Sequence, residues 1–515
     1  MGLETPAWVA DAVVAQVFPD RFRRSGRVAA QQDLELLSWG SPPEQRGFQG
    51  GDLLGVIEGL DRLQSLGVTA LSLNPVFASA AYHRYHTFEY FQVDPLLGGN
   101  AALAALIEAV HGRGMRLILD GVFNHCGRGF WAFHHLLENG EASPYRHWFH
   151  VERWPLNPFP GPGEDCGYHC WWNDPALPRF NHAHPGVRRY LLAVARHWLA
   201  AGIDGWRLDV ADEVPVDFWR EFRETVRTER PDAWIVGEIW RDGRPWLEES
   251  PLADGGLFDG GLFDGVMNYP LTWPVLGYFG AASLRSDLVL PALNSAPYQP
   301  LDRSAFERRV QEVLGWYPAA TRRAQLNLLD GHDTPRALHV LNGDTAALRL
   351  CLLFLFLLPG APCLYYGTEL ELAGGPEPLC REAYPWERSP GPLAAWISRL
   401  AALRHRQPAL RSAELRFLPS PHNDLVLLER GAGPQRLWVA INRGDETLAV
   451  AAPAGAGHRL WPQTPDSAAG DGEHSHDGAP RVARVPGRSA LILALEPDRD
   501  AASAAADTAA PGPPP

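Results

Sequence analysis

Short apolar segments alternate with longer amphipathic segments along most of the chain, and this alternation predicts the fold. Segments of about five apolar, β-favouring residues have the length and composition of buried strands. They lie at 13–18, 68–73, 115–121, 203–209, 233–238, 263–267, 324–329 and 361–366. The intervals carry apolar residues at helical spacing, for example 184–202 and 216–229. Eight repeats of a strand followed by a helix are typical of an α/β fold of the (β/α)8 TIM barrel type.

Two regions depart from this rhythm. Residues 126–182 are rich in Pro, Gly, Trp and His and poor in helical periodicity, and the segment is too long for a simple loop. We expect an inserted subdomain after the third strand, leaning over the barrel mouth. After residue 405 five short alternating strands, ELRFLP, LVLLER, RLWVAINR, LAVAAP and SALILALEP, predict an antiparallel β-sandwich.

These patterns predict four parts of the chain. The barrel takes residues 1–125 and 183–405, the inserted subdomain 126–182, the β-sandwich 406–496, and a disordered tail rich in Ala and Pro 497–515. A tandem copy of GGLFD at 255–265 precedes the sixth strand, and we interpret it as a duplicated loop without catalytic weight.

Three acidic residues follow predicted strands. Asp209 ends the strand GWRLD, Glu238 follows the strand that leads into GEIW, and Asp333 follows the apolar run of NLLDGHDT. A carboxylate at the end of a buried strand is costly unless it has a partner or a task. The carboxyl ends of barrel strands meet at one face, where active sites lie, so the three acids predict an active site.

Charge and composition narrow the class of substrate. The net charge of −14 at pH 7 argues against nucleic acid or an anionic membrane as a partner. All 46 residues counted as Lys or Arg are arginine, and the lack of lysine excludes P-loop phosphate transfer and Schiff-base chemistry. A neutral substrate suits this chain better.

Neither a membrane span nor a secretion signal is expected. The longest apolar run, at 348–366, is interrupted by an arginine, a proline and a glycine, and predicts a buried helix followed by a strand. The first residues lack a basic start and a cleavable apolar stretch, so we expect a cytoplasmic protein. Its six cysteines do not form a disulfide framework. A zinc site at Cys166, His169 and Cys170 is the weaker alternative, because the spacing is loose and no second pair answers it.

The acids suit the cleavage of a glycosidic bond, which needs one ionised and one protonated carboxyl group. Arg207 lies two residues before Asp209 on the same face of the strand, so it is expected to keep that carboxylate ionised. Glu238 has apolar sequence neighbours, which predict a raised pKa and the role of general acid. Asp333, next to His332, is expected to stabilise positive charge on the sugar ring.

Four segments resemble the conserved regions of the α-amylase family of glycoside hydrolases. They are DGVFNH at 120–125, GWRLDVADEV at 205–214, GEIW at 237–240 and LLDGHDT at 328–334. The resemblance extends over about residues 8–495. It implies a retaining mechanism with Asp209 as nucleophile, Glu238 as acid/base and Asp333 as transition-state stabiliser. It also implies a set of substrate-binding residues, namely Tyr85, Asp120, His125, Arg207, Trp240 and His332.

Within that family the chain is most similar to the subgroup of neopullulanases, cyclomaltodextrinases and maltogenic amylases. The segments that carry this likeness are LPRFN, FQGGDLLGV, FDGVMNYP and VADEV. The likeness implies hydrolysis of α-1,4 linkages in maltooligosaccharides, cyclomaltodextrins or pullulan, with transglycosylation alongside, and leaves open whether α-1,6 linkages are cleaved as well. A maltodextrin glucosidase, which shares LNPVF and PLCREAYPW, and a transferase or isomerase such as trehalose synthase stay open as alternatives. A non-catalytic binding subunit is disfavoured because all three acids are present.

Two departures from the subgroup change the expectations. The subgroup carries an additional amino-terminal β-domain that builds a dimer, whereas the first barrel strand here begins almost at once, so we expect a monomer or a weak homo-oligomer. The loop that binds calcium in many relatives reads RRSGRVAAQQ at 23–32, and its arginines would repel a cation. We therefore expect this calcium site to be lost, although Asp52 remains, and no cofactor to be needed.

Overall fold

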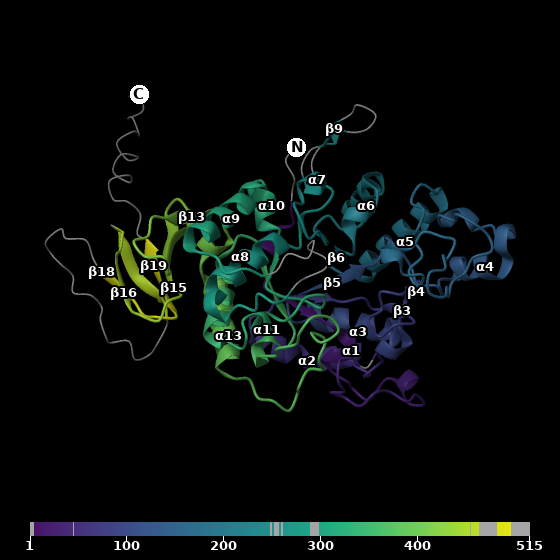
Figure 1. The fold of residues 1–515 in the computed structure, drawn as a ribbon, viewed down its shortest axis with the longest axis horizontal. Coiled ribbons are helices and arrows are strands. Elements are labelled where there is room, and N and C mark those ends of the chain that lie inside the picture. Colours follow the sequence, from purple (N-terminus) through teal and green to yellow (C-terminus); the bar gives the residue numbers. More distant parts are fainter. Residues whose placement is uncertain are drawn as a thin grey trace, which may run out of the picture.

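The computed structural model describes most of the chain (Figure 1). The described residues are 5–44, 46–247, 250–251, 257–258, 261–288, 298–453, 455–462 and 482–495. The predicted disordered tail lies outside the described residues, as does most of the first GGLFD copy.

Eight parallel strands form the central sheet. They run in the order β10-β7-β6-β5-β2-β1-β12-β11. Their bounds are β1 (Val14–Val17), β2 (Ala70–Leu73), β5 (Arg116–Gly121), β6 (Gly205–Leu208), β7 (Trp234–Gly237), β10 (Gly265–Val266), β11 (Leu326–Leu328) and β12 (Ala361–Tyr365). A parallel bridge between Met267 and Leu326 joins the two edges, so the sheet closes into the predicted barrel.

Helices surround the barrel because one face of each is apolar. In α6 the buried side chains Phe218, Phe222 and Val226 recur every four residues, Trp219 is buried beside them, and most of the other positions are charged or polar. The long helices are α2 (Leu53–Ser65), α3 (Gly99–His111), α5 (Pro185–Ala201), α6 (Val216–Glu229), α8 (Tyr269–Gly280), α9 (Arg303–Gly315), α12 (Thr345–Leu357) and α13 (Pro392–Arg406). Shorter ones are α1 (Pro19–Phe22), α7 (Arg244–Leu247), α10 (Ala319–Arg323) and α11 (Ala337–Val340).

The apolar run at 348–366 forms the buried helix and strand that its sequence predicts, α12 and β12. In the part of the chain that the structure describes, no helix combines the length and the apolar character that crossing a membrane requires.

The segment 126–182 contains more helix than its composition predicts. Helix α4 (Trp131–Asn139) buries Ala132, Phe133 and Leu136, and these apolar contacts stabilise a short helix that sequence periodicity alone does not indicate. Single backbone bridges, including His125 with Arg179, hold the rest of the segment against the barrel. A hairpin of β3 (Phe77–Ser79) and β4 (Thr87–Val93), which the sequence pattern did not predict, lies between β2 and α3.

The carboxyl-terminal part is antiparallel, as predicted, and two of its strands were not expected. A five-stranded sheet has the order β13-β14-β15-β19-β17, and β16 pairs with β18 in a smaller sheet. The bounds are β13 (Leu415–Leu418), β14 (Leu425–Ala432), β15 (Gln435–Asn442), β16 (Leu448–Ala451), β17 (Ala456–Trp461), β18 (Val482–Val485) and β19 (Ser489–Leu495). The unexpected strands are β17 and β18. Arg443 fastens this part to the barrel, because its guanidinium donates to the carbonyls of Tyr278 at 2.7 Å and Leu301 at 2.9 Å.

The second GGLFD copy has a structural task. Asp264 is fully buried, accepts a hydrogen bond from the Ile235 backbone N–H at 2.8 Å, and pairs with Arg223 and Arg227. It therefore fixes the amino-terminal half of β7. Upstream of it, the short strands β8 (Ser250–Pro251) and β9 (Leu257–Phe258) pair with each other.

Candidate active site

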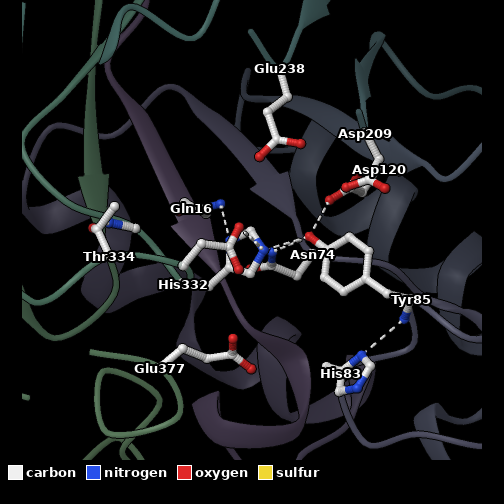
Figure 2. Close-up of polar contacts among 12 residues, drawn as sticks. Gln16, Asn74, His83, Tyr85, Asp120, Asp209, Glu238, His332, Thr334 and Glu377 are labelled. Atoms are coloured by element: carbon white, nitrogen blue, oxygen red, sulfur yellow. Dashed lines mark hydrogen bonds and ion pairs between the residues drawn. The ribbon is translucent and has the colours of Figure 1, made fainter. Parts of the chain in front are cut away.

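The predicted site residues gather at the carboxyl ends of the barrel strands. Asp209 directly follows β6, Glu238 directly follows β7, and Asp333 lies in the loop after β11. Figure 2 shows Asp209, Glu238 and Tyr85 converging on the same space. The barrel closure thus brings Asp209 and Asp333, which are more than a hundred residues apart in the sequence, to the same end of the barrel.

Arg207 is the centre of the acidic cluster. One guanidinium nitrogen, Nη1, lies 2.8 Å from Asp120 Oδ1 and 2.8 Å from Asp209 Oδ1, and Nη2 lies 2.8 Å from Glu238 Oε1. Arg207 is 2 % exposed, so water does little to screen these contacts. One cation therefore holds three carboxylates that come from three adjacent strands.

Burial and the excess of carboxylates over cations in this cluster raise the pKa values of Asp120 and Asp209. Burial raises the pKa of Asp209 well above its usual value, and Glu238 and Asp120 raise it further, while Arg207 offsets only part of the shift. Burial raises the pKa of Asp120 as well. The predicted contact between Arg207 and Asp209 is confirmed, but its expected effect is not, because three acids share the single arginine.

The apolar setting expected for Glu238 is wrong. Its Oε2 accepts a hydrogen bond from the Val210 backbone N–H at 3.1 Å, and its Oε1 accepts one from Trp240 Nε1 at 3.2 Å, besides the contact with Arg207. The apolar neighbours in sequence, Ile235 and Ile239, pack into the protein core instead. Position in the chain did not reveal these partners, because they reach the carboxylate from an adjacent strand and from a loop.

Val210 adopts a conformation that is rare for its type. Its φ and ψ of 46° and 45° lie in the left-handed region, where a β-branched side chain is strained. This backbone turn follows Asp209 immediately and directs the Val210 N–H at Glu238. Such strain persists only where the surrounding structure over-determines it, and it is common at active sites.

Tyr85 connects the two sides of the site. Its hydroxyl donates to Asp120 Oδ2 at 2.9 Å and lies 2.6 Å from His332 Nε2, and its ring stacks parallel to that of His332. Gln16 Nε2 donates to His332 Nδ1 at 3.1 Å, so the imidazole proton is assigned to Nε2, on the side facing Tyr85 (Figure 2).

Asp333 has a different electrostatic setting. Its oxygens lie 2.9 Å from His332 Nε2 and 3.0 Å from Arg381 Nη2. Burial alone would raise the pKa of Asp333, but the interactions with His332 and Arg381 outweigh it and hold this pKa well below the usual range. The carboxylate is therefore ionised at any pH at which the protein is expected to work.

Two residues at this side were not identified as site residues from the sequence. Arg381, 3 % exposed, bridges Asp333 and Glu377, with a distance of 2.8 Å to the latter, and donates to the His332 carbonyl at 2.9 Å. Both belong to the loop after β12. An arginine four residues after an acid in a long loop that follows a barrel strand is the signal that would have found them.

His125 presents an unused nitrogen. The side chain is fully buried, Asn124 Nδ2 lies 3.3 Å from its Nδ1, and its Nε2 has no hydrogen-bond partner within the described part of the chain. Burial lowers the pKa of His125 to about 3, so the ring is neutral. Its ring stacks on Trp171 at 5.2 Å. A neutral imidazole with an unpaired nitrogen is suited to a hydrogen bond with a ligand hydroxyl.

Trp240 lies beside the acid that it bonds. Its indole stacks on the Tyr269 ring, with centroids 3.7 Å apart and planes 6° apart. One face of the indole is thereby covered, and its N–H is oriented toward Glu238. The structure thus places all nine sequence-predicted site residues at this end of the barrel or in the segments that border it.

The residues around Asp52 do not fit a calcium ion. Asp52 Oδ2 accepts from the backbone and side chain of Ser25 at 2.9 Å each, and Oδ1 accepts from the Gly55 N–H at 2.7 Å, which caps α2. Arg23 and Arg27 both pair with Glu58 nearby. Among the described residues no three His, Cys, Asp or Glu side chains cluster as a metal site, and His169 bonds Glu152.

Comparison with known proteins agrees with this geometry. Residues 16–389 match the family model of the α-amylase catalytic domain. The chain is 39% identical to a cyclomaltodextrinase of Geobacillus thermopakistaniensis over 88% of this chain and 72% of that protein. It is 35% identical to neopullulanase 2 of Thermoactinomyces vulgaris over 89% of this chain and 74% of that protein. The solved debranching enzyme of Nostoc punctiforme is 39% identical, with a TM-score of 0.84, over 96% of this chain and 100% of that one.

The chain belongs to the α-amylase family, and it is a glycoside hydrolase of that family. The fold class predicted from the sequence, a TIM barrel with an inserted segment and a carboxyl-terminal β-structure, is confirmed. The subgroup resemblance is confirmed as well, since the relatives carry the names cyclomaltodextrinase and neopullulanase.

Proposed function

We propose that the protein hydrolyses α-glucosidic linkages in maltooligosaccharides, cyclomaltodextrins or pullulan, with retention of configuration at the anomeric carbon. The observation that carries this proposal is the contact of Asp209 and Glu238 with the same guanidinium, each at 2.8 Å, from adjacent strands. That arrangement holds two carboxyl groups side by side, as retaining hydrolysis requires.

In the proposed reaction Asp209 is the nucleophile. Its carboxylate attacks the anomeric carbon while Glu238 donates a proton to the departing glycosidic oxygen, which gives a glycosyl-enzyme. Water then enters, Glu238 takes its proton, and the oxygen of that water replaces Asp209 at the anomeric carbon. Asp333 carries the negative charge that offsets the positive charge on the sugar ring in both transition states.

The remaining site residues would bind the sugar. The unpaired His125 nitrogen offers a hydrogen bond to a ring hydroxyl, and Tyr85, which stacks on His332, offers an aromatic face. Arg207 and Asp120 would set the position and the charge of the nucleophile. Trp240 would contact the sugar on the leaving-group side, because its indole N–H bonds the proposed acid.

The linkage preference is inferred from the relatives. One relative is named neopullulanase and another is named debranching enzyme, so we infer that α-1,6 linkages are accepted beside α-1,4 linkages. A sugar hydroxyl competing with water for the glycosyl-enzyme would give transglycosylation. The expected cytoplasmic location is supported by six free cysteines, and the monomeric or weakly associated state stays a prediction.

Product analysis tests the proposal. Purified protein is incubated with maltotriose, pullulan, starch and β-cyclodextrin, with Asp209→Asn as the blank. Panose from pullulan, or rapid opening of the cyclodextrin ring, would support the proposal. Release of glucose from short linear chains alone would replace it with a maltodextrin glucosidase, and trehalose or mainly longer products would replace it with a transferase.

A further inference from the structure

The inserted segment contains a cavity apart from the proposed catalytic acids. Its volume is about 920 Å³. Charged residues of both signs line it, among them Arg128, Arg179, Glu152 and Asp165, together with two cysteines, Cys166 and Cys170. None of the three predicted catalytic acids contributes to its wall.

The two cysteines face one another. Their Sγ atoms are 3.9 Å apart, and both are free thiols. A disulfide requires about 2.05 Å between the sulfurs, so closing the remaining gap of about 2 Å takes side-chain rotation and a backbone shift. The intervening residues form no helix or strand, and the shift works only against single backbone bridges that join Tyr168 to Val151 and Cys170 to Pro178, ahead of the short 3-10 turn η6 (Trp171–Asn173).

Cys170 is half-buried and Cys166 is buried, and the pair reaches solvent through the cavity. Cys166 and Cys170 line it directly. The remaining four, Cys126, Cys351, Cys363 and Cys380, are buried. An oxidant that enters the cavity therefore reaches these two thiols and no others among its lining residues.

We propose that Cys166 and Cys170 form a reversible disulfide when the protein meets a small-molecule disulfide such as oxidised glutathione, and that this bond modulates the active site. A thiolate of the pair attacks one sulfur of the oxidant, forms a mixed disulfide and releases one thiol. The second cysteine then displaces the other half. The two electrons and the two protons of the pair leave with the two released thiols.

The surroundings favour the second step. Burial raises the pKa of Cys170 to about 12, and the neighbouring Cys166 raises it as well. Once the Cys166 sulfur is in a mixed disulfide it carries no charge, so its contribution to the raised pKa of Cys170 disappears and the attack by Cys170 becomes easier.

The pair is linked to the site through its neighbours in the chain. Cys170 directly precedes Trp171, whose ring stacks on His125 at 5.2 Å. The Cys170 backbone is bridged to Pro178, and Arg179 next to it is bridged to His125. Drawing Cys170 toward Cys166 therefore shifts the indole that supports His125. This regulatory part rests on the proposed function, whereas the covalent part does not.

Mass spectrometry tests the covalent part. The full native chain is incubated with oxidised glutathione, blocked with iodoacetamide and digested with trypsin. Because the sequence has no lysine, cleavage after Arg153 and Arg179 releases a single peptide that holds both cysteines. The expected result is a mass loss of about 2 Da in this peptide without alkylation, reversed by dithiothreitol. A persistent glutathione adduct, or two alkylated cysteines after prolonged treatment, would overturn the inference.

Activity assays test the regulatory part. Oxidation is expected to lower kcat/KM by about threefold or more, because small misplacements of binding groups are costly, with recovery on reduction. Cys170→Ser and Cys166→Ser should each be insensitive to the oxidant, while Cys351→Ala, a buried cysteine of α12, should respond as the native chain does. If oxidised glutathione lowered the activity of Cys170→Ser as much as that of the native chain, the link to the site would be refuted. Absence of activity before oxidation would count against the proposed function alone, since the mass result is read separately.

Discussion

The two sides of the site contain the same kinds of side chain but shift the pKa of an aspartate in opposite directions. On one side Arg207 is shared by Asp120, Asp209 and Glu238. On the other, Asp333 interacts with both His332 and Arg381. The pKa of Asp209 is raised and that of Asp333 is lowered, although both are aspartates within one cleft.

The ratio of acids to cations accounts for the difference. A buried carboxylate that shares one arginine with two others gains too little attraction to offset its desolvation. A carboxylate with two partners of its own gains more than it loses. The second side therefore provides a permanent negative charge for a cationic transition state.

Arg381→Met should have the largest effect on the difference between the two sides, because it removes the charge that keeps Asp333 ionised. We expect kcat/KM to fall by about a hundredfold and the acid limb of its pH profile to move to higher pH. Steady-state kinetics between pH 4 and pH 8 check this. Glu377→Gln, which removes the other acidic partner of Arg381 and leaves Asp333 paired, is the control and should cost about threefold at most. An unchanged pH profile in Arg381→Met would contradict the account.

Replacing Asp209 or Asp333 by asparagine should sharpen the comparison, because the two replacements should change the free energy of unfolding at pH 7 in opposite directions. The raised pKa of Asp209 favours its protonated form in the folded state, so its contribution to stability is full below the unfolded pKa and is lost as pH rises through the folded value. The lowered pKa of Asp333 gives a contribution present above the unfolded pKa and lost as pH falls through the folded value.

At pH 7 Asp209→Asn should therefore stabilise the protein and Asp333→Asn should destabilise it, each by on the order of 1 kcal/mol in the free energy of unfolding. Urea unfolding at pH 7 and at pH 4 measures both variants. The gain from Asp209→Asn should shrink at pH 4. Destabilisation by both variants at pH 7 would show that hydrogen bonding, not charge balance, dominates on the Arg207 side.

Val210→Gly tests the strain beside the first cluster. Glycine adopts the left-handed conformation without a steric penalty, so the relief of strain should offset the loss of the buried valine side chain. The free energy of unfolding should therefore change by less than about 1 kcal/mol. Val210→Ala, which keeps the penalty and loses the packing, is the matched control and should be the less stable of the two. Equal denaturant midpoints would argue that Val210 carries no strain.

Chelation should have the smallest effect. Asp52 is fully occupied by Ser25 and Gly55, so a calorimetric scan with and without EDTA should show melting temperatures within about 1 °C. Sodium chloride at matched ionic strength controls for charge screening. A large drop in melting temperature on chelation would restore a calcium site.

The sequence determined the eight barrel strands and their order, because each depends on local pattern. These strands lie within a residue or two of their predicted positions, and α6 occupies residues 216–229 as predicted. The catalytic candidates were found because buried acids at strand ends are rare enough to indicate a task. In a parallel barrel, moreover, strand ends meet at one face whatever the helices between them.

Contacts between distant residues were decided only by the tertiary structure. The Glu238 carboxylate bonds Val210 and Arg207 rather than its apolar neighbours, and Arg381 reaches Asp333 from a loop 48 residues later. The proton affinity of each acid depends on the number of cations within about 4 Å, a quantity that periodicity does not encode. The chain therefore specified which groups would meet at the barrel mouth, and folding decided which of them hold a proton.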